Sequence, residues 1–355
     1  MTAGEGMHIV VTGATGNVGT SLLRSLTADP RVTSVLGIAR RVPNIQLDKT
    51  RWVAADVASD ELAAHFRGAD VVVHLAWIIQ PSRDLYELRR VNVGGSTKVF
   101  EAVAEAGVGA LVYASSVGAY STGPKDRAVD ESWPTDGIET SFYSRHKSEV
   151  ERHLDAFEAD HPDIRVVRLR PALIFKREAA SGIRRLFIGP FLPNFLVRST
   201  FVPAVPDVDD LRFQAVHSYD AGEAYLLAAL GDARGAFNIA ADPMLGPEEL
   251  GDVFDARRVR VPGGLLRAAA AVSWRLRLQP SPEGWIEMGY RAPLMDTTRA
   301  RIELGWVPRY SSIEALRELL HGLRTGAGYP TPVLEPDLRS VRVKELLTGL
   351  GKRGP

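Results

Sequence analysis

The stretch His8-Ile-Val-Val-Thr-Gly-Ala-Thr-Gly-Asn-Val-Gly19 joins an apolar strand pattern directly to an apolar helix pattern that runs to residue 28. Three glycines with two residues between each, at such a junction, are typical of a dinucleotide-binding turn. Gly13 permits the tight turn, Gly16 lets the backbone approach a pyrophosphate, and Gly19 lets the helix pack close to the strand. The N–H groups at the helix start attract the anion. The expected phosphate contacts are Gly13, Thr15, Gly16, Asn17, Val18 and Gly19.

The first half of the chain continues to alternate short β-branched runs with longer helical patterns. Further strands are expected at 32–38, 51–54, 71–75, 110–115 and 164–169. Because these runs are apolar on both faces, they predict a parallel sheet covered by helices on each side. The expected fold class is therefore α/β, a Rossmann-type doubly wound parallel sheet with a smaller C-terminal α+β substrate lobe.

The chain of 355 residues divides into three expected parts. Residues 1–170 form the dinucleotide-binding domain, which takes back a strand and a helix near 211–231. Residues 171–324 form the substrate-binding lobe, because prolines interrupt an aromatic stretch after residue 171. Residues 325–355 carry scattered Pro, Gly and Arg and are expected to form a tail.

Composition excludes several function classes. Lys plus Arg and Asp plus Glu both number 43, so the net charge of zero gives no support for a nucleic-acid or acidic-membrane partner. The absence of cysteine excludes disulfides, thiolate metal sites and cysteine nucleophiles, and no metal site is expected. No apolar run approaches the roughly 18 residues of a spanning helix. We expect a cytoplasmic protein that acts on a small molecule.

The residues after the second expected strand bear on the choice of cofactor. Ala39 stands where NAD-preferring sites place a carboxylate for the ribose 2′-hydroxyl, and Arg40 and Arg41 follow. Guanidinium groups pair well with a 2′-phosphate, so NADP(H) is favoured and NAD(H) stays possible. Two arginines here are also compatible with ordinary surface charge. Asp56, followed by Val57, suits either the adenine amino group or a helix-capping role.

Tyr143 and Lys147 lie four residues apart in a helical pattern and therefore share one helix face. A phenol has a pKa near 10, and a neighbouring ammonium group lowers it toward the range useful for acid–base catalysis. This spacing is common by chance. The catalytic interpretation is strengthened by Ser116, which lies at the end of an expected strand. Ligands of open α/β sheets bind at that edge, although serine is also an ordinary turn residue.

Together these residues resemble the extended short-chain dehydrogenase/reductase family, which includes nucleotide-sugar epimerases, 4,6-dehydratases, 3β-hydroxysteroid dehydrogenases and carbonyl reductases. The resemblance covers residues 7–322. Its further motifs are His74-Leu-Ala76, Asn92 with Gly95, Arg170-Pro-Ala172, Val216-His217 with Asp220, Phe237-Asn238 and Leu304-Gly-Trp-x-Pro308.

The resemblance implies a role for each matching residue. Tyr143 is implied as the general acid–base, Lys147 as the residue that binds the nicotinamide ribose and lowers the tyrosine pKa, and Ser116 as the residue that orients the reacting oxygen. Further cofactor contacts are implied for Leu75, Ala76, Pro171 and Ala172. A homodimer through the helices expected at 84–106 and 143–159 is also implied.

Departures from the family pattern bear on which of the family's reactions and substrates to expect. Dehydratases carry Asp-Glu after the strand-end hydroxyl residue, whereas Val117-Gly118 follows Ser116, so dehydration is not expected. The asparagine that nucleotide-sugar enzymes carry after the Arg170 strand is missing, and Arg212 is displaced from the position of their diphosphate-binding basic residue. The expected substrate contacts are Trp77, Val117, Phe175 and Arg212.

The preferred interpretation is an NADP(H)-dependent oxidoreductase that interconverts a ketone and a secondary alcohol on a small or amphipathic substrate. The alternative is an NAD-dependent nucleotide-sugar epimerase. A non-catalytic dinucleotide-sensing protein is a third interpretation, because a fold alone does not give a function.

Overall fold

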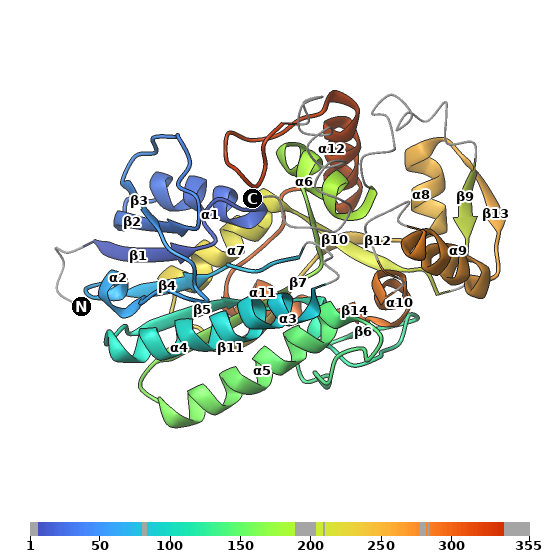
Figure 1. Cartoon of the computed structure of the whole chain (residues 1–355). Helices are drawn as coiled ribbons and strands as arrows, with labels where there is room; N and C mark the ends of the chain where they lie inside the picture. The colour runs from blue at the N-terminus through green and yellow to red at the C-terminus, as the bar shows by residue number, and fades with distance from the viewer. Residues whose placement is uncertain are drawn as a thin grey trace.

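A seven-stranded parallel sheet organises the protein (Figure 1). The structure is a computed structural model that describes residues 6–79, 84–188, 204–208, 210–276, 282 and 284–336. The sheet order is β11-β7-β5-β4-β1-β2-β3. The strands are β1 (Met7–Thr12), β2 (Val32–Ala39), β3 (Thr50–Ala54), β4 (Val71–His74), β5 (Ala110–Ala114), β7 (Arg165–Pro171) and β11 (Gly235–Ile239). The strand order reverses between β1 and β4, where ligands of doubly wound sheets bind. The predicted Rossmann-type fold is confirmed.

Helices cover both faces of this sheet because its central strands β1 and β4 are apolar on both sides (Figure 1). In β1, Ile9 and Val11 pack into one hydrophobic cluster and Val10 packs into the other. The first cluster contains residues of α1 (Asn17–Ala28), α7 (Ser218–Leu230) and α11 (Thr298–Glu303). The second contains residues of α2 (Ala63–Phe66), α4 (Gly95–Glu105) and α5 (Phe142–Asp160).

The helix expected over 84–106 is interrupted by a π-helical turn. It consists of α3 (Leu85–Arg89), the π-helical turn η1 (Arg90–Gly94) and α4. The buried Asn92 lies in this turn, and its side chain accepts a hydrogen bond from Ile78 N at 2.8 Å and donates one to Ile78 O at 3.0 Å. Turns of this kind often occur at functional sites. Here the turn holds the loop that follows β4.

Besides the main sheet, the described residues form three small sheets and several helices, most of them in the C-terminal lobe. A three-stranded sheet has the order β12-β10-β8, and β13 pairs with β9 and β14 with β6. These strands are β6 (Ala128–Val129), β8 (Leu173–Phe175), β9 (Ala204–Asp207), β10 (Phe213–His217), β12 (Ala241–Leu245), β13 (Arg257–Arg260) and β14 (Leu294–Met295). The helices are α6 (Ala180–Ile183), α8 (Pro247–Phe254), α9 (Gly263–Arg275), α10 (Gly284–Arg291) and α12 (Ser312–Thr325). Short helical turns lie at η2 (Val117–Ala119), η3 (Arg177–Ala179) and η4 (Arg184–Ile188).

The return of the chain to the main sheet differs from the expectation. The strand expected to return near 211–231 is β10, and it joins the three-stranded sheet instead. Helix α7 does pack against the main sheet, and the strand that completes that sheet is β11, which pairs in parallel with β7. The reason is that β8 continues from the end of β7 into the lobe and pairs there with β10.

The residues after α12 also differ from the expected tail. Residues 326–336 pack against α6 and the glycine turn, with Leu334 only 3% exposed. The remainder of that segment lies outside the described residues. Among the helices described, none combines the length and the apolar character needed to cross a membrane.

Candidate active site

The glycine turn between β1 and α1 lies against the loop that follows β4. Gly13 has a φ of +71°, and a Cβ there would lie 2.6 Å from Ala76 N and 2.7 Å from Leu75 C. A Cβ on Gly19 would lie 2.5 Å from Gly13 O. Any larger residue at either position would therefore push the turn away from β4 or lift α1 off the turn.

The start of α1 fits an anionic group such as a dinucleotide pyrophosphate. Gly16 is its N-cap and has no side chain with which to cap the first N–H groups. The first turn of α1 contains no acidic residue. A helix start with these properties attracts an anion through its N–H groups and its dipole.

The other expected loop residues hold the turn in place. Asn17 Nδ2 donates to Ile174 O at 3.0 Å, and Val18 packs against the first hydrophobic cluster. Thr15 is buried, and its carbonyl oxygen accepts a hydrogen bond from Thr331 Oγ1 at 2.9 Å. The glycine turn is thus bound to the C-terminal lobe at both Asn17 and Thr15.

The residues expected near the adenosine half lie at the ends of β2 and β3. Arg40 and Arg41 are exposed directly after β2, and Gly13 N donates to Ile38 O at 3.0 Å, so this strand end lies beside the glycine turn. The Asp56 carboxylate accepts a hydrogen bond from Ala58 N at 3.0 Å and so stabilises its own turn. The side chain of Val57, next in the chain, is buried beside Gly95 in α4.

Ser116 and Tyr143 meet at the carboxyl end of β5. Ser116 accepts a hydrogen bond from Gly118 N at 3.0 Å, and its side chain lies close enough to Tyr143 to influence the pKa of the phenol. A Cβ on Gly118 would lie 2.9 Å from the Tyr143 ring, so this glycine lets the phenol approach the strand end. Tyr143 lies in the first turn of α5, where Ser141 is the N-cap. Burial raises the pKa of Tyr143 to about 12, and the nearby Ser116 side chain acts to lower it.

Lys147 lies one helical turn after Tyr143 and is only 2% exposed. Its ammonium group donates to Ala114 O at 2.7 Å and lies 3.5 Å from the centre of the Trp77 ring. Burial holds the pKa of Lys147 well below its ordinary value, and the negative charge of Glu151 acts in the opposite direction.

Apolar and aromatic side chains surround the Tyr143 phenol. The Trp77 and Trp285 ring centres lie 6.1 Å and 4.9 Å from that of Tyr143, and Val117 packs into the same hydrophobic cluster. Ala172 lies at the end of β7, where its N–H group donates to Ile239 O at 2.9 Å, directly after Pro171.

Two of the expected substrate contacts, Phe175 and Arg212, do not lie in the group of side chains around Tyr143. Phe175 packs with the residues that hold α12 against the three-stranded sheet. Arg212 is exposed, and its carbonyl oxygen accepts a hydrogen bond from Lys125 Nζ at 2.7 Å.

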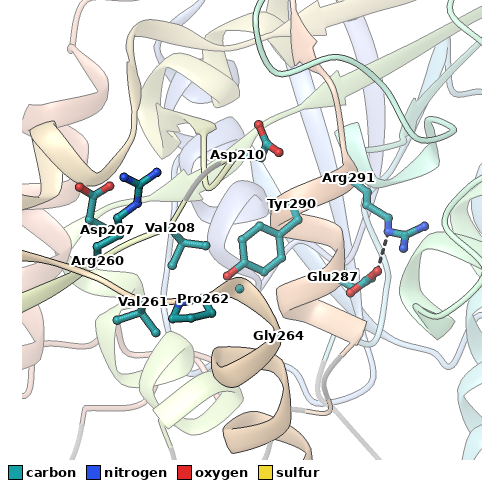
Figure 2. Close-up of a pocket in the computed structure, with 11 residues that line it drawn as sticks. Asp207, Val208, Asp210, Arg260, Val261, Pro262, Gly264, Glu287, Tyr290 and Arg291 are labelled. Atoms are coloured by element: carbon teal, nitrogen blue, oxygen red, sulfur yellow. Dashed lines mark ion pairs between the residues drawn. The ribbon is translucent and has the colours of Figure 1, made fainter.

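A pocket of about 720 Å³ lies in the C-terminal lobe, between β9 and β13 on one side and α9 and α10 on the other (Figure 2). Its lining includes Asp207, Arg260, Tyr290 and an ion pair at 2.5 Å between Glu287 and Arg291. Helix α10 carries Tyr290 on the pocket wall and also Trp285, which contacts Tyr143. The pocket and the Tyr143 site therefore share one helix.

The comparison with protein families assigns this chain. A family model described as the NAD dependent epimerase/dehydratase family matches residues 9–240. The chain belongs to this family. The assignment agrees with the resemblance to extended short-chain dehydrogenases/reductases and with NAD(H) as the class of cofactor.

Individual relatives and solved structures are similar to this epimerase/dehydratase family member. An uncharacterised protein of Mycobacterium tuberculosis is 26% identical over 351 residues, which cover 92% of this chain and 86% of the relative. The UDP-glucose 4-epimerase of Thermotoga maritima, solved with UDP-glucose, has a TM-score of 0.67 at 21% identity and covers 90% of this chain and 99% of its own. The dTDP-glucose 4,6-dehydratase of Streptomyces venezuelae, solved with NAD, has a TM-score of 0.65 at 20% identity, with coverages of 90% and 97%.

Sequence reasoning missed two residues beside the site of this family member. Trp285 contacts Tyr143, and Lys176 donates hydrogen bonds to the first residues of α1. Neither residue belongs to a local motif, and each reaches the site only through folding of the C-terminal lobe. The aromatic content of that lobe was the one available signal, and it did not single out Trp285.

Proposed function

We propose that this protein is an NAD(P)-dependent oxidoreductase that interconverts a secondary alcohol and a ketone. The observation that carries the proposal is the grouping of Ser116, Tyr143 and Lys147 at the carboxyl edge of the sheet, close to the glycine turn. Such a grouping supplies a proton-transfer group, a cation and a hydroxyl group that orients an oxygen atom.

The cofactor assignment rests on the turn and the strand ends. The turn from Gly13 to Gly19 would hold the pyrophosphate, while Asp56 and Val57 would lie toward the adenine. Arg40 and Arg41 support a preference for NADP(H), because each adds positive charge where a 2′-phosphate would lie. When bound, the nicotinamide supplies the donor or acceptor of the hydride. Its neighbours would be Leu75, Ala76, Pro171 and Ala172.

Tyr143 would transfer the proton. In the oxidative direction its phenolate takes the proton of the substrate hydroxyl, and in the reductive direction its phenol returns a proton to the carbonyl oxygen. Because burial raises the pKa of Tyr143 to about 12, the phenolate requires a positive charge nearby. Lys147, one helical turn along α5, would provide this charge in its ammonium form, which the negative charge of Glu151 favours. Ser116 would hold the reacting oxygen in line with the phenol.

The surroundings of Tyr143 support a compact substrate with an apolar part. Trp77, Val117 and Trp285 form walls close to the phenol, and apolar walls with few polar groups are typical of small-molecule sites. This arrangement favours the ketone reductase over an enzyme that must turn a sugar ring within the site.

A nucleotide-sugar epimerase is the second candidate, because a specific observation favours it. Arg260, Tyr290 and Arg291 line the pocket in the C-terminal lobe, where a diphosphate and a base would find cationic and aromatic partners. The solved Thermotoga maritima protein is itself a UDP-glucose 4-epimerase. An epimerase would use the same Ser116, Tyr143 and Lys147 but would retain its cofactor between turnovers.

One set of measurements separates these functions. Mass spectrometry of the purified protein identifies any retained nucleotide, and the stripped protein is then tested with NADPH and NADH against cyclic and acyclic ketones. Ketone reduction by the wild type, lost in Tyr143→Phe with nearly unchanged cofactor affinity, is the expected result. Epimerisation of UDP-glucose without added cofactor would favour the second candidate. Failure to bind either dinucleotide would overturn both.

A further inference from the structure

Lys176 is a buried cation beside the first turns of α1. Only 2% of the residue is exposed, and it lies directly after β8 in the C-terminal lobe. Its Nζ donates hydrogen bonds to Asn17 O at 2.9 Å, Thr20 Oγ1 at 2.7 Å and Ser21 Oγ at 3.0 Å. All three acceptors lie in the helix that the glycine turn begins.

This position is electrostatically unfavourable for the protein alone. The start of a helix carries a partial positive charge, so a cation beside it is repelled. Removing an ammonium group from water adds a further cost. Nearby, the charge of Glu178 favours the ammonium and that of Arg24 opposes it. An anion bound at the start of α1 would offset both costs.

A second contact holds the same turn from the C-terminal lobe. Thr331 is 2% exposed, and its hydroxyl group donates to the carbonyl oxygen of Thr15. Its segment is fixed to α6, because Ser181 N donates to Ala327 O at 3.2 Å and Ser181 Oγ donates to Leu334 O at 3.3 Å. Figure 1 shows this segment, coloured dark red, running from α12 back toward α1.

We propose that Lys176 and Thr331 are positioning residues for the cofactor pyrophosphate, supplied by the C-terminal lobe to the glycine turn. Lys176 adds positive potential from behind the first turn of α1, and Thr331 fixes the carbonyl group of Thr15 so that the following N–H groups keep their direction. This inference rests on the proposed function only in requiring a dinucleotide at the glycine turn. It makes the affinity for the cofactor depend on the fold of the substrate lobe.

The test compares ligands that contain a pyrophosphate with one that lacks it. The Lys176→Met variant keeps most of the apolar stem and removes the charge. Isothermal titration calorimetry measures the affinities of NADPH, NADH, ADP-ribose and adenosine. We expect Lys176→Met to weaken the dinucleotides and ADP-ribose about tenfold and adenosine less than about twofold, because the lost charge acts on the phosphates. Lys176→Arg should retain most of the affinity.

Lys125→Met is the matched control. Lys125 is also a buried lysine, and it donates hydrogen bonds to the carbonyl oxygens of Arg212 and Gly289, in the C-terminal lobe. Its substitution should leave the affinities for all four ligands unchanged, even where it lowers the melting temperature. This control separates the loss of any buried lysine from the loss of the one beside α1.

The Thr331 variants test the second contact. Thr331→Val removes the hydroxyl group at nearly constant volume and should weaken ADP-ribose about threefold to tenfold, as expected for one lost hydrogen bond. Thr331→Ser should restore the affinity. Neither variant removes a buried charge, so they remain informative where Lys176→Met fails to fold.

Distinct outcomes overturn the inference and the proposed function. Wild-type protein that binds ADP-ribose, with Lys176 and Thr331 variants that bind it equally well, overturns the inference and leaves the function intact. Equal losses for ADP-ribose and adenosine also overturn it, because they would show a purely structural role. Wild-type protein that binds neither dinucleotide overturns both.

Discussion

The ammonium group of Lys147 lies 3.5 Å from the centre of the Trp77 indole ring. Trp77 belongs to the loop after β4, and Asn92 fixes that loop through both hydrogen bonds to Ile78. The position of the ammonium relative to Tyr143 therefore depends on a π-helical turn that contains neither residue. A cation held against an aromatic face is stabilised by about 0.5 to 2 kcal/mol.

Replacing Trp77 should test this contact. We expect Trp77→Leu to lower kcat/KM roughly tenfold, because Lys147 loses one of the contacts that hold its charge near the phenol. Trp77→Phe keeps an aromatic face and should retain most of the activity. Steady-state kinetics with the best ketone substrate measure the difference. Equal rates for Trp77→Leu and the wild type would show that the aromatic face does not support Lys147.

Glu151 should control the acid stability of the protein. Its carboxylate is buried and accepts hydrogen bonds from Arg170 Nε at 2.9 Å and Arg168 Nη1 at 3.0 Å. Burial acts to raise its pKa, but the two arginines and Ser115 outweigh burial and lower it from 4.5 to about 2. This contribution to stability is fully present above pH 4.5 and is lost as the pH falls toward about 2.

Glu151→Gln should therefore lower the free energy of unfolding at neutral pH by about 3 to 5 kcal/mol, because it leaves the buried charge of Arg170 uncompensated, while Arg168 keeps its ion pair with Asp155. Urea unfolding as a function of pH measures the effect. The difference between wild type and variant should shrink below pH 4.5. A constant difference down to the acid limit would contradict this account. Glu149→Gln is the control, because Glu149 is only partly buried and pairs with the exposed Arg89.

The sequence predicted the parts of the site that depend on local pattern. The glycine turn was recognisable because three glycines separate a strand from a helix, and Tyr143 and Lys147 because they share one helix face. Ser116, which lies far away in the sequence, was a candidate because it follows an expected strand, and the resemblance implied its role. Six of the seven strands of the parallel sheet followed from runs that are apolar on both faces, whereas the place of β11 beside β7 was not predicted.

The remaining features depend on contacts between distant segments. Lys176 follows an ordinary strand pattern, and no sequence rule indicates that its side chain ends beside Thr20. Thr331 lies in a stretch rich in Pro and Gly that resembles a tail. The π-helical turn at Asn92 occurs within a continuous helical pattern, because the turn is fixed by hydrogen bonds to Ile78 rather than by its own residues.

Arg40 and Arg41 should decide the choice between dinucleotides. We expect the double variant Arg40→Ala with Arg41→Ala to weaken NADPH about a hundredfold or more, since each charged hydrogen bond to a phosphate contributes about 1.5 to 3 kcal/mol. The affinity for NADH should change little. Fluorescence titration with both reduced cofactors measures the ratio. Equal losses for NADPH and NADH would show that the arginines do not recognise the 2′-phosphate.

Ala39→Asp should shift the preference in the opposite way. Ala39 is the last residue of β2, where a carboxylate would meet the ribose hydroxyl groups of NADH and repel the 2′-phosphate of NADPH. The same titration measures the change. Ala54→Asp is a control at the end of the neighbouring β3, which should leave the ratio of the two affinities unchanged.

The affinity for the cofactor should fall at alkaline pH through Lys176. Burial lowers the pKa of Lys176 to about 8, with Glu178 acting to raise it and Arg24 to lower it. The rings of Tyr219 and Tyr329 also face the ammonium, at 5.7 Å and 6.0 Å. The ammonium is present below this pKa and is lost above it, so the attraction for the pyrophosphate should weaken as the pH rises through about 8.

Calorimetric titration of ADP-ribose over this pH range should show affinity that falls in the wild type and stays nearly flat in Lys176→Met. Because binding favours the ammonium form, the wild type should also take up protons on binding above the pKa, which titrations in buffers of different ionisation enthalpy detect. Lys147 and Tyr143 titrate alike in both proteins, so the difference between them belongs to Lys176. Parallel pH profiles for the two proteins would assign the alkaline loss to another group.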